Sequence, residues 1–89
     1  MTTLYQIDSD VLFKRLDDRM VLVHLSSNRI FELNETGARI WELLQKGVAT
    51  EDLLAQIPKE FEADHESLNE EIKNLLNDLE TENLIKRLR

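Results

Sequence analysis

The amino-acid sequence predicts a single α+β domain in which a three-stranded antiparallel sheet is followed by three helices. Two observations predict this class. In the first third of the chain, short apolar segments alternate with polar turns, as is typical of strands. From Asn34 onward, apolar residues instead recur every three or four positions, as in amphipathic helices. Strands followed by three helices, the second of them short, form the outline of a winged helix-turn-helix.

Three short apolar segments are the expected strands. They are residues 11–16, 20–25 and 29–33, separated by the polar turns "DDR" and "SSN". Because the connections are so short, consecutive strands are expected to run antiparallel as a meander. Side chains alternate along a strand, so we expect Phe31 and Leu33 to face the core while Ile30 and Glu32 face outward.

The first expected helix follows the third strand directly. Asn34 is a suitable N-cap because its side-chain oxygen can accept a hydrogen bond from the N–H of Thr36 or Gly37. Glu35 is favourable beside the positive end of the helix dipole, and Gly47 is a suitable stop. This junction predicts a fixed angle between the third strand and the first helix.

Two further helices are expected. Thr50 is predicted to cap a short second helix, which Pro58 is predicted to end. Residues 59–64 are predicted to form a loop from which Phe61 reaches the core. Asp64 is expected to cap the third and longest helix, whose apolar stripe is Leu68, Ile72, Leu75 and Leu79. The last residues, "NLIKRLR", alternate weakly, and the pattern leaves both a strand and a helix end open.

The composition limits the possible classes of protein. The 89 residues, 42% of them apolar, are expected to form one domain, residues 1–89, with one small core. The absence of cysteine excludes disulfides, thiolate metal sites and a cysteine nucleophile. The apolar segments are too short to span a bilayer, and the N-terminus lacks the pattern of a signal peptide, so a cytoplasmic location is expected.

The charge is negative and unevenly distributed. The net charge is -7, and residues 51–82 contain eleven acids against only Lys59 and Lys73. Because affinity for nucleic acid and for anionic membranes depends on Lys and Arg, we expect neither as a partner. The usual interpretation of such an acidic run is a solvated surface, and a docking surface is the alternative.

The titratable residues form no pattern typical of a catalytic or metal-binding site. His24 and His65 lie far apart without the spacing of metal ligands. The adjacent acids at 17–18 and 70–71 have no nucleophile or base pattern near them. We therefore expect no enzyme activity, no metal and no cofactor.

The segment "RIFELNETGARIWELL", followed by "TEDLLAQI" and a long helix ending in "LLNDLETENLI", resembles the PqqD-like family of peptide-recognition domains. The resemblance extends from about Val11 to Ile85. Its most specific part consists of Leu33, Asn34, Thr36, Gly37, Ile40 and Trp41. The chain lacks the "PEG" stretch and the Asp-Gly pair of proteins most similar to PqqD itself. As a short free-standing chain it most resembles the B1 proteins of lasso-peptide biosynthesis.

This resemblance implies a non-catalytic adaptor. Such a protein binds the leader of a ribosomally made precursor peptide by strand addition and presents it to a separate enzyme, for lasso peptides a leader peptidase. An adaptor for another modifying enzyme, such as a radical SAM enzyme of a PQQ-type pathway, is one alternative. A winged-helix DNA-binding regulator is another, which the outline of the fold permits and the net charge opposes.

The expected peptide site lies between the open edge of the third strand and one flank of the third helix. The strand contains no proline that would block pairing. On a helical wheel Leu76 lies at the edge of the apolar stripe, so we expect it to be a partly exposed floor, although ordinary core is the alternative. The expected binding residues are Asn28, Arg29, Ile30, Phe31, Glu32 and Leu33 on the strand, and Asn69, Ile72, Lys73, Leu76 and Glu80 on the helix.

Overall fold

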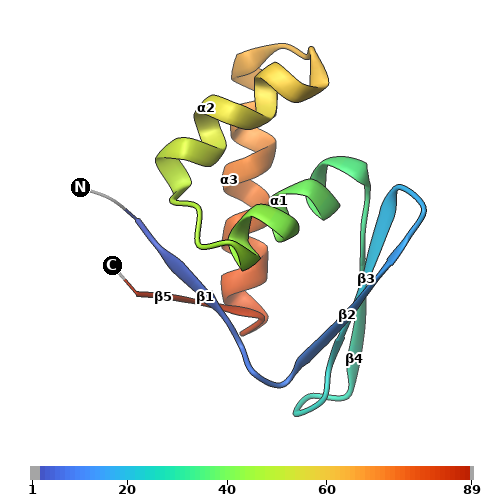
Figure 1. Ribbon diagram of the computed structural model, residues 1–89. Coiled ribbons are helices and arrows are strands. Elements are labelled where there is room, and N and C mark those ends of the chain that lie inside the picture. The colour runs from blue at the N-terminus through green and yellow to red at the C-terminus, as the bar shows by residue number, and fades with distance from the viewer. Residues whose placement is uncertain (1–2, 89) are drawn as a thin grey trace.

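A computed structural model describes residues 3–88 and confirms the α+β class, with a three-stranded antiparallel sheet followed by three helices (Figure 1). In chain order the elements are β1 (Tyr5–Ile7), β2 (Val11–Leu16), β3 (Arg19–His24), β4 (Arg29–Leu33), α1 (Glu35–Gln45), α2 (Thr50–Phe61), α3 (His65–Thr81) and β5 (Ile85–Arg87). The bounds of β2 and β4 are those that the sequence predicts.

The main sheet has the order β2-β3-β4, so β3 is central and both β2 and β4 are edge strands. The strand β3 begins and ends one residue earlier than expected. The cause is a two-residue turn: Asp17 adopts a left-handed backbone with φ +56°, which tight hairpins require and Asp tolerates. Arg19 is therefore already paired with Leu16.

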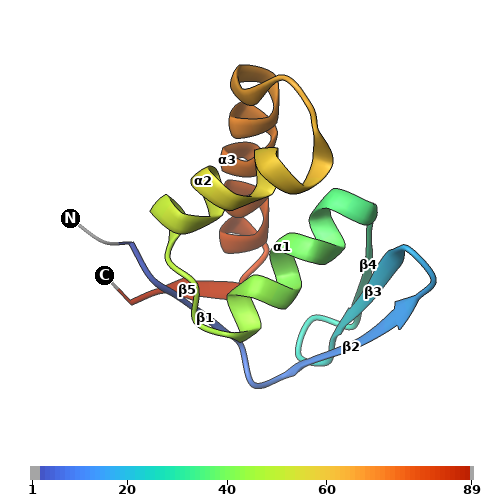
Figure 2. The same cartoon turned by 45° about the horizontal axis from the view of Figure 1, so that its top comes forward.

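The core lies between the sheet and the helices, and α1 runs through its middle (Figure 2). Trp41 on α1 is fully buried, as expected, and the ring of Phe13 on β2 packs edge-on against it, with 5.8 Å between centroids. Other fully buried side chains come from every layer: Leu22, Ile40, Leu53, Ile57, Ile72 and Leu84. One core thus fixes the sheet relative to all three helices.

A second, two-stranded sheet pairs the two ends of the chain. β1 runs antiparallel to β5, with Tyr5 opposite Arg87. The C-terminal residues that the sequence left open are therefore a strand. The strand β1 was not predicted, because three residues are too few to display an alternating pattern. This pair lies on the other side of α1 from the main sheet (Figures 1 and 2).

The second helix differs from its prediction at both ends. Ala49 is the N-cap and no side chain caps α2, so the prediction that Thr50 caps it is wrong. Thr50 is instead the first helical residue, and its N–H donates to the carbonyl of Thr3 at 3.0 Å. Pro58 does not end the helix, which continues to Phe61 and makes residues 59–61 helical rather than loop. Burial of Pro58 and packing of Phe61 against the core offset the hydrogen bond that proline removes.

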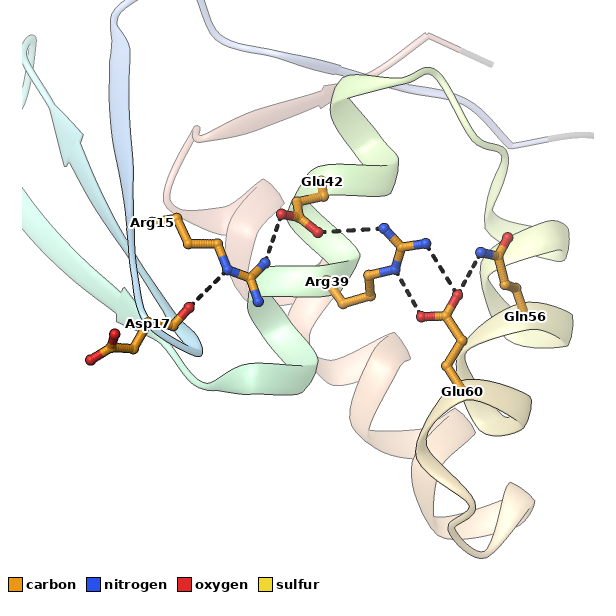
Figure 3. A network of polar contacts seen from close by, with 6 residues as sticks. All are labelled: Arg15, Asp17, Arg39, Glu42, Gln56 and Glu60. Atoms are coloured by element: carbon orange, nitrogen blue, oxygen red, sulfur yellow. Dashed lines mark hydrogen bonds and ion pairs between the residues drawn. The ribbon is translucent and has the colours of Figure 1, made fainter.

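Polar contacts connect β2, α1 and α2 on one side of the molecule (Figure 3). Glu42 on α1 accepts hydrogen bonds from Arg15 at 2.6 Å and from Arg39 at 3.4 Å. Arg39 also pairs with Glu60 on α2 through two hydrogen bonds of 2.8 and 3.2 Å. The hydrogen bond from Arg39, with one from Gln56, holds the pKa of Glu60 below its usual value. The network supplements apolar packing in positioning α1.

Candidate functional site

Two adjoining hollows of about 350 and 400 Å³ lie between β4 and α3. They share four lining residues, Glu32 and Leu33 from β4 and Leu75 and Asp78 from α3. One hollow extends to the N-terminus of α1 and the other to Leu84, before β5. We call the two together the groove. It is the kind of space that the sequence predicts beside the third strand.

The backbone of β4 offers hydrogen-bonding groups to the free edge. The N–H of Leu25 donates to the carbonyl of Asp10 at 3.0 Å. Hydrogen-bonded and non-hydrogen-bonded pairs alternate along an antiparallel ladder. The preceding residue, His24, therefore points its N–H and C=O toward its β4 partner, Arg29. Within β4, Ile30 and Glu32 therefore point their N–H and C=O groups away from β3, toward the free edge.

The side chains of β4 alternate as predicted. Ile30 is 72% exposed and Glu32 is exposed, both on the outer face of the sheet. Phe31 is half-buried and packs against the core, while Leu33 is buried. The structure thus places Ile30 beside the free edge, with the apolar side chains of Phe31 and Leu33 lining the groove.

The helical wall of the groove differs from its prediction. Leu76 is 3% exposed and Ile72 is fully buried, so the expectation that Leu76 forms a partly exposed floor is wrong. Both side chains belong to the core, the alternative left open for Leu76. Leu75, predicted to lie in the core stripe, is only half-buried and lines both hollows.

Helical geometry explains the error. At about 100° per residue, Glu71, Leu75 and Asp78 share one narrow stripe of α3, and this stripe faces β4. Asn69, Lys73 and Glu80 lie on the opposite flank. The structure therefore does not bring these three residues together with the predicted β4 residues. An apolar stripe reveals which face of a helix is buried, but both flanks of that stripe look alike in the sequence.

The opposite flank of α3 faces the paired chain ends. Lys73, Leu76 and Glu80 line a separate hollow of about 250 Å³ with Thr50 and Arg87. The side-chain oxygen of Asn69 is buried and has no hydrogen-bond partner among the described residues. This side of the helix supports the β1–β5 pair rather than the groove.

One end of the groove is bridged by an ion pair. Arg29, at the start of β4, donates a hydrogen bond to Glu82, which caps the C-terminus of α3. The guanidinium also lies over the ring of Phe31, 5.1 Å from its centroid. The preceding residue, Asn28, has φ +59° and ends the β3–β4 turn. The contacts of Arg29 join the two walls of the groove.

The junction of β4 and α1 forms the other end. The side chain of Asn34 accepts a hydrogen bond from the N–H of Gly37 at 2.9 Å, which confirms the predicted cap. A Cβ atom at Gly37 would lie 3.1 Å from Cβ of Leu33 and 3.5 Å from Cδ2 of Leu75. The absence of a side chain at this position lets β4, α1 and α3 approach closely at this end of the groove.

The groove is acidic. Its lining includes three carboxylates on the α3 side, Glu71, Asp78 and Glu82, and one base, Arg29, whereas Glu32 borders it through the strand and carries its carboxylate on the outer face. Arg29 is paired with Glu82, and Glu32 is paired with Arg19 at 2.6 Å. Such a lining favours a ligand with cationic side chains and an extended backbone.

Other features of the described residues point to structural roles. Within residues 3–88, no three His, Asp or Glu side chains are placed to hold a metal ion together. His24 is buried between Asp8 and Ser27, at 2.9 Å from each, and joins two loops. Another hollow, of about 760 Å³, is an open polar surface beside β1 and β5. None of the three described helices has the length and apolar character needed to span a membrane.

Comparison with known proteins places these features in a family. The family model described as coenzyme PQQ synthesis protein D (PqqD) matches residues 19–85. The chain belongs to the PqqD family. The matched range includes all of β3, β4 and the three helices, and therefore both walls of the groove. No curated protein matches the chain significantly.

Two solved structures of B1 proteins resemble this PqqD-family chain. TbiB1 in complex with the TbiA(beta) leader peptide is 30% identical, with a TM-score of 0.83 over 91% of this chain and 94% of that one. A lasso peptide synthetase B1 complexed with the leader peptide is 22% identical, with a TM-score of 0.80 over 92% of this chain and 96% of that one. The first supports kinship within the family, and the second shows the fold.

Proposed function

We propose that this PqqD-family chain is a non-catalytic adaptor that binds the leader of a ribosomally made precursor peptide. It presents the leader to a separate processing enzyme, of which a lasso leader peptidase is the first candidate. The observation that carries the proposal is the similarity to TbiB1, whose structure contains the TbiA(beta) leader peptide.

The free edge of β4 supports binding by strand addition. The backbone groups of Ile30 point to that edge, and an added antiparallel strand would lie about 4.8 Å from β4, beside the groove. Alternate side chains of the peptide would then point toward Leu33 and Leu75 in the groove. Backbone hydrogen bonds would supply affinity and these apolar contacts would supply selectivity.

The chemistry of the groove suits binding rather than catalysis. Its described lining consists of apolar side chains, carboxylates, short polar side chains and the paired Arg29. Chemical processing is therefore assigned to the partner enzyme. The description of the family model, coenzyme PQQ synthesis, favours a second candidate, an adaptor for a different peptide-modifying enzyme.

A binding titration tests the proposal. The probe is a fluorescein-labelled leader of the precursor encoded beside this chain, with the TbiA(beta) leader as a second probe and a scrambled leader as control. We expect micromolar or tighter affinity, about -8 kcal/mol or better, for the cognate leader. Absence of saturable binding by both leaders at 100 μM protein, on the order of a hundredfold above that, would contradict the proposal.

The regulator alternative has its own measurement. A winged-helix DNA-binding protein should shift duplex DNA at low salt even without a specific site, because non-specific affinity is electrostatic. With a net charge of -7, we expect no shift. A shift at 20 mM salt together with no leader binding would favour a regulator.

A further inference from the structure

The strand β5, like β4, has a free backbone edge, since within residues 3–88 it pairs only with β1. The N–H of Leu88 donates to the carbonyl of Leu4 at 2.8 Å, so these two residues form a hydrogen-bonded pair at the end of the β1–β5 ladder. Because such pairs alternate with non-hydrogen-bonded pairs, the next pair, Tyr5 and Arg87, is of the second kind. Arg87 and Ile85 therefore point their N–H and C=O groups away from β1, toward the free edge.

The open hollow of about 760 Å³ lies against this strand. Its lining includes all three residues of β5, Glu80 and Asn83 from the end of α3, and residues 6–9 from β1 and the loop after it. Except for Ile7 and Ile85, these residues are polar or charged. A lining of this kind suits an extended peptide, whose backbone groups can pair with both the strand edge and the polar side chains.

The charged groups of the hollow differ in whether they already have partners. Glu80 pairs with Arg87 at 3.4 Å, and Asp8 accepts a hydrogen bond from His24 at 2.9 Å. Lys86 is exposed and forms no ion pair with a carboxylate of residues 3–88. A ligand carboxylate would therefore find one cation in the hollow available to it.

The groove ends where this hollow begins. Leu84 lines the groove and Asn83 lines the hollow, and the two residues are neighbours in the turn between α3 and β5. Asn83 has φ +61°, the left-handed backbone that tight turns use and Asn tolerates. A leader antiparallel to β4 would pass Leu33 first and Arg29 last. Its C-terminal side would therefore leave the groove at the end that Leu84 borders.

We propose that the segment of the precursor directly downstream of the leader strand binds this hollow and pairs with the free edge of β5. The inference rests on the proposed function, because it needs a leader bound along β4. It goes further in naming a second binding site, which extends the recognised part of the precursor beyond the groove. An Asp or Glu side chain of this segment pairs with Lys86.

The distance between the two sites is within reach of one continuous peptide. The fold measures 35 × 32 × 20 Å. An extended chain covers about 3.3 Å per residue, so about ten residues span the longest of these dimensions. Because the groove and the hollow border the same turn, a shorter segment connects them.

The chemistry of the hollow favours a peptide over a second copy of the chain. The centre of a stable protein interface is depleted of charged residues. The hollow instead contains Asp8, Glu80, Lys86 and Arg87. Its continuity with the groove makes the precursor the expected occupant.

Truncation of the precursor separates the two sites. The probe is the precursor peptide encoded beside this chain, labelled with fluorescein at its N-terminus and shortened from its C-terminus two residues at a time. Anisotropy gives the affinity of each peptide for the parent, for Lys86→Glu and for Lys59→Glu. Lys59 is the matched control, because it is exposed on α2, does not line the hollow and gives the same change of net charge. Circular dichroism establishes that the variants fold.

We expect the affinity of the parent to fall in two steps as the peptide is shortened. The first step, about tenfold, removes the segment in the hollow, and the second removes the strand on β4 and abolishes binding. Lys86→Glu should bind the full precursor about tenfold more weakly than the parent and should lack the first step. Lys59→Glu should match the parent within about twofold, since an exposed charge outside the hollow contributes little.

Hydrogen exchange of the Arg87 amide reports pairing at the edge of β5. The full precursor should slow this exchange, whereas a peptide that lacks the downstream segment should not. A single step in the truncation series, equal affinities of the two variants, or unchanged exchange at Arg87 would each overturn the inference. So would a dimer in sedimentation velocity that Lys86→Glu dissociates, because the hollow would then join two copies. Failure of the parent to bind any of the peptides would instead refute the proposed function.

Discussion

Gly37 in the first turn of α1 lies directly against Leu33 at the end of β4. A Cβ atom added to Gly37 would be 3.1 Å from Cβ of Leu33, closer than ordinary van der Waals contact. Leu33 Cβ is attached to the strand backbone and cannot rotate away, so the strand itself would have to shift. The close approach explains why the sequence fixes the strand-to-helix junction at Asn34 so firmly.

We predict that Gly37→Ala destabilises the protein by about 1 kcal/mol and weakens leader binding. Overpacking a tight site costs more here than the small helix-propensity gain at the first turn. Urea unfolding gives the stability and anisotropy gives the affinity. Gly47→Ala is the contrasting variant. No atom lies within 4 Å of its added Cβ, so any loss of stability comes only from the left-handed backbone at φ +81°. Its leader affinity should not change. A Gly37→Ala protein with parental affinity would refute a role for this contact in shaping the groove.

The free-edge geometry predicts that Ile30→Pro weakens leader binding. Proline removes an N–H that points away from β3, so the sheet keeps its own hydrogen bonds while an added strand loses a donor. Ile30→Thr is the control, because it keeps the N–H and the preference for a strand. Anisotropy should show at least a tenfold greater loss for Ile30→Pro than for Ile30→Thr. Equal affinity of the two folded variants would argue against strand addition along β4.

Adjacent leucines on α3 should behave differently. Leu75→Ala is expected to lower leader affinity by about 1 to 3 kcal/mol, because its half-buried side chain lines the groove. Leu76→Ala should instead lower stability by about 2 to 5 kcal/mol, because Leu76 is buried in the core. Thermal unfolding and leader titration of both variants check the pair. The reverse pattern would mean that the leader uses the opposite flank of α3.

The acidic lining predicts a salt-dependent association rate. Carboxylates attract a cationic segment over roughly 10 Å at 0.1 M salt, so stopped-flow association should slow as salt rises while dissociation changes little. Glu71→Gln, in the groove, should reduce this salt dependence more than Glu70→Gln, which lies on the solvent side of the same turn. An association rate that does not depend on salt would mean that the acidic surface serves solubility or binds the enzyme rather than the leader.

The contact between Asp8 and His24 predicts a difference in acid stability. The hydrogen bond from His24 holds the pKa of Asp8 below its usual value of 3.8. A carboxylate with a lowered folded-state pKa stabilises the protein above its unfolded pKa, and this contribution is lost as pH falls through the folded value. Urea unfolding from pH 6 to pH 3 should therefore show a shallower loss for Asp8→Asn than for the parent. Parallel curves would contradict the role of Asp8.

The sequence predicted the main sheet, the caps at Asn34 and Asp64 and the outward orientation of Ile30, because each depends on local chemistry or on a period of two. The errors have a different origin. Pro58 inside α2 is tolerated through tertiary packing that no local rule contains. The strand β1 depends on a partner at the far end of the chain.

Only one of the two walls of the candidate site was predicted correctly, because local patterns determine one wall and tertiary packing determines the other. Its β4 wall follows from strand alternation, whereas its α3 wall depends on which flank of the helix turns toward the sheet. Glu71, Leu75, Asp78 and Glu82 recur at helical spacing and were visible as a stripe. The sequence does not distinguish that stripe from the one containing Asn69, Lys73 and Glu80, because only the three-dimensional structure shows which of the two faces β4.

The pairing of Tyr5 with Arg87 brings the ends of the described chain together on the side away from the main sheet (Figure 1). A short linker between the two ends would convert the fold into a closed ring without crossing the groove. Ring closure removes conformational freedom from the unfolded chain alone, so it stabilises the folded state without any new contact. The same proximity would let a circular permutant open at the Asp17 turn, leaving β4 and α3 on one uninterrupted segment.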